Sequence, residues 1–244
     1  TSPISKKYLN FTSLPFFIGK DENSLNFYSY KLPGDSSSLL PSEYYESHYN
    51  SSFRVNSKIH VVSKSLDSAL EFINYDIDFL KLDTQGSELL ILENAQKSLK
   101  NCLMIECECE FIEMYSGQPL FHDISKFLYE KKFELLYLNR VFVSREKPRF
   151  KRCRGQLIFG DALFGLRFEA ARHLELRKKF SYIILLINYG HIDFAYRLFF
   201  DDKKLIKKHP NLSKYLSSCE AKSTNNIFSL SKFTLSVFLD WILY

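Results

Sequence analysis

The chain has 244 residues and 45% of them are hydrophobic, which is enough for one large globular domain or for a domain with an appendage. Lysine and arginine exceed the acidic residues by five, so the charge is compatible with an anionic partner such as a phosphate-bearing substrate or a lipid headgroup, whereas we expect no nucleic acid. The five cysteines include no C-x-x-C pair, the N-terminus shows no signal-peptide pattern and no run of about 18 apolar residues occurs, which argues against zinc, export and a membrane span and predicts a cytoplasmic protein.

The N-terminal part of the chain predicts short strands followed by a long loop. Apolar runs predict strands at 14–19 and 24–32, joined by a turn in which Asp, Asn and Ser side chains can bond to nearby backbone. Residues 33–52 are polar, rich in tyrosine and without periodicity, so we expect a long loop there. Long loops in compact domains are often functional lids.

Strand and helix patterns then alternate along the chain. The expected elements are a strand at 58–64, a helix at 65–75, a strand at 76–83, a helix at 86–101, a strand at 102–109, a helix at 120–132, and strands at 133–138 and 155–165. The near-continuous apolar character of 76–83 suits a strand that is covered on both faces. The alternation predicts an α/β fold with a mostly parallel sheet.

Beyond Leu166 only helical periodicity remains, so we expect two regions, 1–166 and a helical region at 167–244. The end of the chain, 226–244, is rich in Phe, Leu and Ile but interrupted by Ser, Lys and Asp. It could be a helix docked on the domain, a dimer contact or a helix lying at a membrane interface. The basic segment 145–154 is likewise either an anion-binding loop or a solvated one.

The stretch DFLKLDTQGSELLILENA (78–95) points to a site, because a buried strand ends in the carboxylate of Asp83. Ligands of open parallel sheets bind at the carboxyl ends of the strands. Lys81 and Asp83 share one face of the strand, Gly86 permits a tight turn, and Glu88 falls in the first turn of a helix. Glu88 could therefore be a ligand-binding residue or only a helix-start residue favoured by the helix dipole.

The next strand carries Glu106, Glu108 and Glu110 at alternate positions, so all three acids face one way. We expect Glu106 to pair with Lys81, and Glu108 and Glu110 to lie beside Asp83, if the two strands are neighbours. Such carboxylates could bind a cation, orient hydroxyl groups or act as a general base, and the sequence does not choose among these roles.

Three motifs in order resemble the FkbM family of S-adenosylmethionine-dependent methyltransferases, in the variant with a K-[IL]-D-T-Q-G-x-E centre. They are KLDTQGSE, then YSGQPLF, then GQLIFGDALF, and the resemblance covers roughly 14–166. It implies a class I methyltransferase fold, Rossmann-like, with a seven-stranded sheet ending in an antiparallel hairpin. It also implies methyl transfer from S-adenosylmethionine to an oxygen, often a hydroxyl of a sugar, a glycan or another small-molecule acceptor.

The resemblance carries specific residues over to this chain by motif match. They are Asp83, Gln85 and Glu88 of the central motif, Glu108 and Tyr115 of the E-x-x-F-x-x-x-Y segment, and Asp161 of the last strand. We expect Asp83 and Glu108 to be catalytic, with a divalent metal, if any, held by the same pair. Gln85, Glu88, Tyr115 and Asp161 are the expected acceptor-binding residues.

Further candidates are weaker. Tyr44, Tyr45 and Tyr49 of the long loop could cover the acceptor, or the loop could be an ordinary surface segment. His122 is a lesser candidate for the base and could equally be a capping or surface residue.

The chain also departs from the family pattern. Ser87 stands where relatives often carry an aromatic residue, and no D-x-G-A-N-x-G turn or following ribose-binding acid is present. We therefore expect the first strands and the principal cofactor site to lie outside this sequence, as in a fragment or a split protein. The alternatives are a partial or degenerate methyltransferase domain that serves as a non-catalytic binding or scaffold module, and a glycan-assembly factor held peripherally at a membrane.

Overall fold

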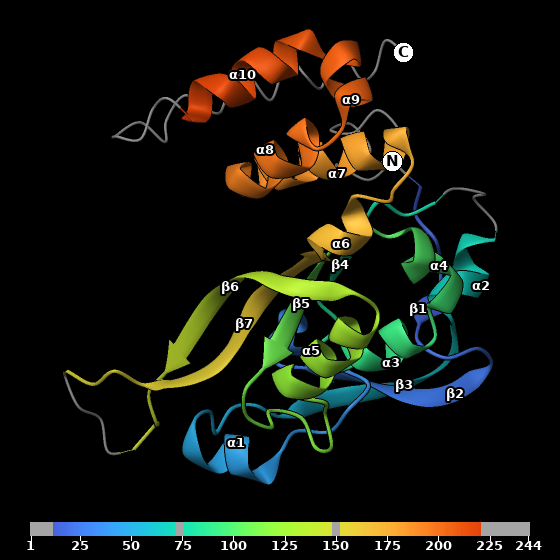
Figure 1. Ribbon diagram of the computed structural model, residues 1–244. Coiled ribbons are helices and arrows are strands. Elements are labelled where there is room, and N and C mark those ends of the chain that lie inside the picture. The colour runs from blue at the N-terminus through green and yellow to red at the C-terminus, as the bar shows by residue number, and fades with distance from the viewer. Residues whose placement is uncertain (1–11, 72–75, 148–151, 221–244) are drawn as a thin grey trace.

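We describe the chain from a computed structural model that defines residues 12–71, 76–147 and 152–220 (Figure 1). Within these residues the strands form one four-stranded and one three-stranded sheet. The apolar tail at 226–244, for which we weighed three roles, lies outside the described residues, as does part of the basic segment 145–154.

The four-stranded sheet contains β4 (Phe79–Leu82), β5 (Met104–Glu110), β7 (Gln156–Leu166) and β6 (Phe133–Val143), in the order β4-β5-β7-β6. β4 and β5 are parallel, whereas β7 is antiparallel to both β5 and β6. One strand therefore runs against the other three, and the last two form a long hairpin that projects to the left in Figure 1.

The three-stranded sheet contains β1 (Phe17–Ile18), β3 (Val55–Lys64) and β2 (Asn23–Tyr30). β1 is parallel to β3, and β2 is antiparallel to it. The predicted α/β composition is confirmed. A mostly parallel sheet is not confirmed, because among the described strands only β4 with β5 and β1 with β3 pair in parallel.

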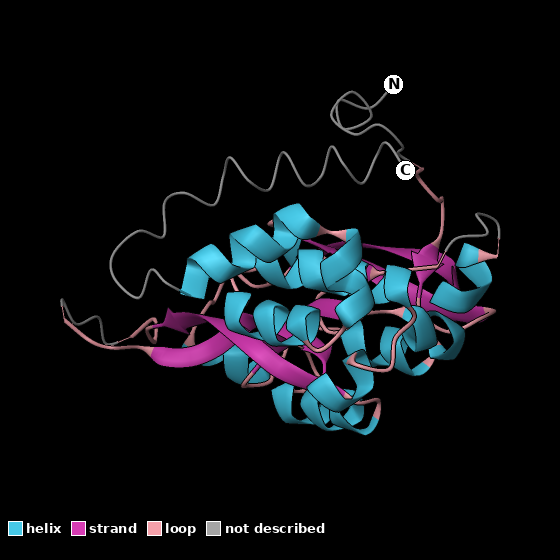
Figure 2. Ribbon diagram, turned by 45° about the horizontal axis from the view of Figure 1, so that its top comes forward, coloured by secondary structure: helices cyan, strands magenta, loops and turns pink. Residues whose placement is uncertain are grey.

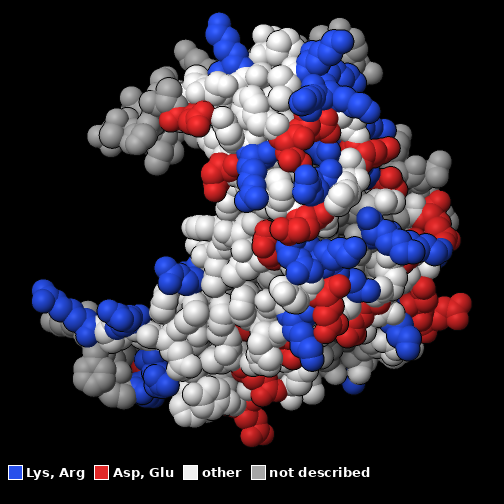
Figure 3. All heavy atoms as spheres, in the orientation of Figure 1, with Lys and Arg blue, Asp and Glu red and all other residues white. Residues whose placement is uncertain are grey.

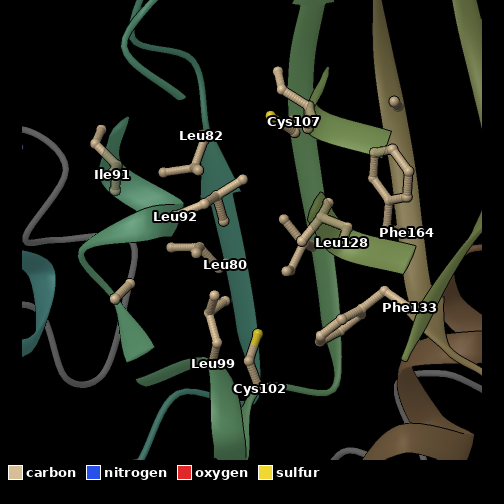
Figure 4. Close-up of a cluster of buried hydrophobic side chains, with 14 of the residues drawn as sticks. Leu80, Leu82, Ile91, Leu92, Leu99, Cys102, Cys107, Leu128, Phe133 and Phe164 are labelled. Carbon is tan, nitrogen blue, oxygen red and sulfur yellow. The ribbon is translucent and has the colours of Figure 1, made fainter. Parts of the chain in front are cut away.

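Helices α2 (Leu66–Leu70), α3 (Glu88–Glu93), α4 (Gln96–Asn101) and α5 (Phe121–Glu130) accompany the strands. Figure 4 shows the core that α3, α4 and α5 share with the four-stranded sheet, in which Leu80 and Leu82 of β4 meet Leu92 of α3 and Leu128 of α5. This core fixes which face of β4 is apolar, and so which face is left for polar residues.

The single helix expected at 86–101 is instead two helices, α3 and α4. Asp67 accepts hydrogen bonds from the backbone nitrogens of Lys97 and Ser98, both at 2.8 Å, and from the Ser98 hydroxyl at 2.6 Å. The backbone nitrogens at the start of α4 thereby gain a partner from another element, as a helix start requires. The sequence of the helix itself does not contain this signal.

The segment at 33–52 is not a simple loop, and that prediction was wrong. It contains a short 3-10 helix (Pro33–Asp35) and α1 (Glu43–His48). Tyr45 and Tyr49 are buried in an aromatic cluster with Tyr30, Phe53 and Tyr115, while Tyr44 is exposed. Aromatic packing therefore fixes this segment, which polar composition and missing periodicity did not reveal.

Residues 168–220 are helical, as their periodicity predicts. The helices are α6 (Phe168–Ala171), α7 (Leu176–Asn188), α8 (Ile192–Phe200), α9 (Lys203–Lys208) and α10 (Pro210–Glu220). They gather at the top of Figure 1 and come forward of the strands in Figure 2. Tyr182 and Leu186 of α7 share a core with Met104 of β5 and Leu163 of β7, so the helices pack directly against the sheet.

None of the helices in the described ranges combines the length and the apolar character that crossing a membrane requires.

Candidate functional site

Strand register places the predicted acids side by side. Lys81 of β4 is paired with Glu106 of β5, and Glu108 of β5 is paired with Asp161 of β7. Asp83, two residues beyond Lys81, therefore lies beside Glu108. The result is a line of polar side chains across one sheet face, spaced by the roughly 4.8 Å between strands.

Asn139 of β6 completes this line. It is paired in register with Asp161, and its amide nitrogen lies 3.4 Å from an Asp161 carboxylate oxygen. We call the four side chains of Asp83, Glu108, Asp161 and Asn139 the polar row. Asn139 was missed by the sequence analysis because the strand at 133–138 was expected to end before it. In the structure the following residues continue the hairpin with β7 as far as Val143.

Gln85 joins two members of the row. Its side-chain nitrogen donates to Asp83 Oδ1 at 3.1 Å and also to Glu108 Oε2. Its side-chain oxygen accepts from the Tyr115 hydroxyl at 2.7 Å. Since a hydroxyl can donate to the oxygen and two carboxylates can accept from the nitrogen, these partners fix the orientation of the amide. Four of the six predicted site residues, Asp83, Gln85, Glu108 and Tyr115, are therefore in direct contact.

Glu88 has a different setting from these four. It is 1% exposed, and it accepts from the Thr84 backbone nitrogen at 2.6 Å, the Thr84 hydroxyl at 2.9 Å and the Gly86 backbone nitrogen at 2.9 Å. Both carboxylate oxygens are thus used inside the turn that joins β4 to α3. This geometry favours the helix-start role that the sequence analysis kept open for Glu88.

A strap at 37–41 lies over the same turn. The Ser37 hydroxyl donates to the Gln85 backbone oxygen at 2.6 Å, and the Ser38 and Ser87 hydroxyls are 2.9 Å apart. The backbone oxygen of Leu40 accepts from the backbone nitrogen of Ser116 at 2.8 Å. The serine at position 87, a departure from the family pattern, is thereby accounted for as a partner of the strap. Single serines in a polar segment gave no sequence signal for these contacts.

Glu106 is held as an ion by its neighbours. Burial acts to raise its pKa, but hydrogen bonds from Lys81 and from the Tyr189 hydroxyl outweigh burial, and the pKa of Glu106 is lowered. The predicted pairing of Glu106 with Lys81 is confirmed. The hydrogen bond to Glu106 in turn raises the pKa of Lys81, whose side chain is about half exposed.

In the described ranges neither Glu108 nor Glu110 forms an ion pair with a basic side chain, and both pKa values are shifted the other way. Burial, followed by the charges of Asp83, Glu88 and Asp161, raises the pKa of Glu108 to about 8. Burial, followed by the charges of Glu88 and Glu108, raises the pKa of Glu110 to about 8. Adjacent acids on one strand face thus hold different charges at neutral pH, a pattern that often accompanies acid–base chemistry.

The polar row is open to solvent in the described residues. Asp83 is exposed, and Glu108 and Asp161 are half-buried. A depression of about 360 Å³ lies elsewhere, lined by Lys31, Ser51, Ser52, Arg54 and Asn56. His122 is exposed on α5 and contacts Asp123 at 3.5 Å, so it is not brought to the row. In the part of the chain that the structure describes, no group of three or more His, Cys, Asp or Glu side chains is arranged to hold a metal ion.

The charge distribution over one face of the molecule is mixed. Figure 3 shows Lys and Arg side chains at the far end of the hairpin formed by β6 and β7 and near the helices at the top, with acids interspersed between them.

Comparison with known proteins identifies a family. Residues 2–135 match the family model described as the Methyltransferase FkbM domain, which is more than half of the chain. The matched span includes Asp83, Gln85, Glu108 and Tyr115 and ends before Asp161. No curated protein matches the chain, and no solved structure does.

Proposed function

Because the chain belongs to the FkbM methyltransferase family, we propose that it is an S-adenosylmethionine-dependent O-methyltransferase whose polar row binds the acceptor. The acceptor is a hydroxyl-bearing sugar, glycan or other small molecule. The observation that carries the proposal is the linked set of Asp83, Gln85, Glu108 and Tyr115. These residues place two carboxyl groups at the exposed end of β4 and β5.

The roles within this set follow from exposure and charge. Asp83 is exposed and accepts the hydrogen bond of the acceptor hydroxyl. Glu108 lies beside it with a pKa raised to about 8 by burial and by neighbouring acids, so Glu108 holds its proton at neutral pH. As the pH rises through 8, Glu108 loses its proton and can accept one, and removal of the hydroxyl proton becomes easier. Gln85 holds the two groups in place, and Tyr115 holds Gln85.

The cofactor supplies the methyl group on a sulfonium sulfur when it is bound. The described residues do not fit it. Upstream of β4 they contain only the isolated glycines Gly19 and Gly34, and among the described strands β4 has β5 as its one neighbour. In Rossmann-like sheets, the cofactor usually binds at a glycine-rich turn that follows a strand. The proposed residue roles therefore concern the acceptor and its proton.

These same two observations favour a second candidate, a partial or degenerate methyltransferase domain that acts as a non-catalytic binding module. Calorimetric titration of S-adenosylhomocysteine into the chain at neutral pH distinguishes the two. Binding supports the enzyme, and no binding combined with no transfer supports the binding module.

Transfer itself is tested with isotope-labelled S-adenosylmethionine and a panel of mono- and oligosaccharide acceptors. We expect Asp83→Asn to abolish labelling while its circular dichroism stays that of the wild type, because an amide cannot accept the hydroxyl proton. Undiminished labelling by this variant would contradict the assigned role.

A further inference from the structure

Tyr189, which directly follows α7 in the helical region, reaches the sheet face that carries the polar row. Its hydroxyl donates to Glu106 Oε2 at 2.7 Å. Its ring is stacked on Phe79 of β4, with the ring centroids 5.6 Å apart and the planes at 29°. Phe79, Lys81 and Asp83 alternate along the chain onto the same face. Tyr189 therefore contacts both β4, which is followed by Asp83, and β5, which carries Glu108.

The position of Tyr189 is fixed by the helix that carries it. Lys178 of α7 donates to Asp78, just before β4, at 2.6 Å, and the Tyr182 hydroxyl donates to the Leu166 backbone oxygen at 2.8 Å. At the other end of α7, the backbone nitrogen of Tyr189 donates to the Leu185 oxygen at 3.0 Å, and Gly190 follows with φ of 85°. A left-handed glycine is a common way to end a helix. Tyr189 therefore lies at the end of a helix that is bonded to the sheet.

With Tyr189, both carboxylate oxygens of Glu106 accept a hydrogen bond. One carboxylate oxygen of Glu106 accepts from Lys81 and the other from Tyr189. The Lys81 side chain is thereby held on the same strand face as Asp83. Lys81 precedes Asp83 by two residues, which is about 6.6 Å along the strand. The charged and titratable groups facing this point are Lys81 and Asp83 from β4, Glu106 and Glu108 from β5, and Asp161 from β7.

We propose that Tyr189 is a positioning residue of the acceptor site, which acts by holding Glu106 so that the Lys81 ammonium faces the acids of the polar row. The inference rests on the proposed function for the role of the row. It assigns a part in the site to the helical region, which lies outside the span that matches the family model. The charges of Asp161 and Asp83 act on Lys81, so the placement of its ammonium group influences how readily the acids of the polar row carry charge together.

The test compares Tyr189→Phe with Tyr182→Phe in the full chain. Each variant removes one phenol hydroxyl that joins α7 to the sheet and keeps the ring, but only Tyr189 contacts Glu106. The side-chain carboxyl carbons are titrated by NMR in protein labelled with 13C-glutamate, and the Glu106 and Glu108 signals are assigned with the corresponding glutamine variants. This readout requires no enzymatic activity.

We expect Tyr189→Phe to raise the pKa of Glu106, which loses a donor, and that of Glu108, because Lys81 is no longer held toward the polar row. We expect Tyr182→Phe to leave both titrations unchanged. Unchanged titrations in Tyr189→Phe, or equal shifts in the two variants, would overturn the inference.

Transfer rates add a second readout. Labelling by Tyr189→Phe should be lower than that of the wild type at pH 7 and equal to it at higher pH, because the midpoint of the profile of rate against pH rises. A purely structural defect would lower labelling by the same factor at every pH. If Asp83→Asn abolishes labelling but Tyr189→Phe keeps the wild-type pH profile, the inference fails and the proposed function stands. If Asp83→Asn labels normally, the proposed function fails, and the NMR titration still decides whether Tyr189 positions Glu106.

Discussion

Replacing Glu108 with glutamine should stabilise the protein, and increasingly so as the pH rises. The folded protein raises the pKa of Glu108 from its ordinary value of 4.5 to about 8, chiefly through burial and then through the nearby acids. Between these two values the folded state holds a proton that the unfolded chain has released, so the free energy of unfolding falls as the pH increases. The loss of stability caused by ionising Glu108 is complete above pH 8 and absent below pH 4.5.

The size of the effect follows from the shift. A rise from 4.5 to about 8 corresponds to roughly 5 kcal/mol at high pH, at 1.36 kcal/mol for each pKa unit. Glu108 is only half-buried, so solvent screening reduces this destabilisation to roughly 2 kcal/mol. Glutamine has the shape of the protonated acid and can keep the hydrogen bond from Gln85. Glu108→Gln should therefore raise Tm by roughly 4–8 °C at pH 9.

The assay is thermal and urea unfolding of both proteins at pH 5 and pH 9, followed by far-ultraviolet circular dichroism. Glu93→Gln, at an exposed position of α3, is the matched control and should change neither midpoint. A stabilisation of Glu108→Gln that is equal at both pH values, or a loss of stability that grows with pH, would refute the electrostatic account of the polar row.

Three further variants test other parts of the fold by urea unfolding. Tyr115→Phe removes the hydroxyl that lies within hydrogen-bond distance of the Gln85 side-chain oxygen and of the Asp35 backbone oxygen, and should cost about 0.5–1.5 kcal/mol; an unchanged midpoint would contradict these contacts. Gly86→Ala combines φ of 97° with a new carbon 3.0 Å from a leucine methyl group and should cost about 1–3 kcal/mol, whereas Gly34→Ala, with open space around it, should be neutral; equal effects would disprove the strain argument. Leu92→Ala empties a fully buried position and should cost about 2–5 kcal/mol, against little for exposed Leu32→Ala.

The strand-face pattern of the site could be predicted from the sequence because it depends on alternation alone. Once β4 and β5 are neighbours, the period of two residues places Lys81 opposite Glu106 and Asp83 beside Glu108. The contact of Gln85 with both acids needed one further fact, its positive φ of 56°, which turns the side chain back over the strand end. Composition and periodicity do not specify that angle.

Contacts between distant segments could not be predicted in this way. Tyr189 and Glu106 are 83 residues apart, and the periodicity of α7 identifies its buried side without identifying what covers it. The burial of Tyr45 and Tyr49 depends on aromatic partners from other segments, Tyr30 and Tyr115 among them. In both cases the deciding partner lies on a different element, where a local pattern contains no information about it.

The place of β7 between β5 and β6 sets the order in which the sheet can form during synthesis. β7 is last of the four strands along the chain, yet it is the neighbour of both β5 and β6. Until residues 156–166 have left the ribosome, β6 has no partner in this sheet, and one edge of β5 stays open for pairing with other chains. A chain cut at residue 135, where the family match ends, would keep that open edge and should aggregate rather than fold. Expression of truncated forms should therefore extend at least through Leu166.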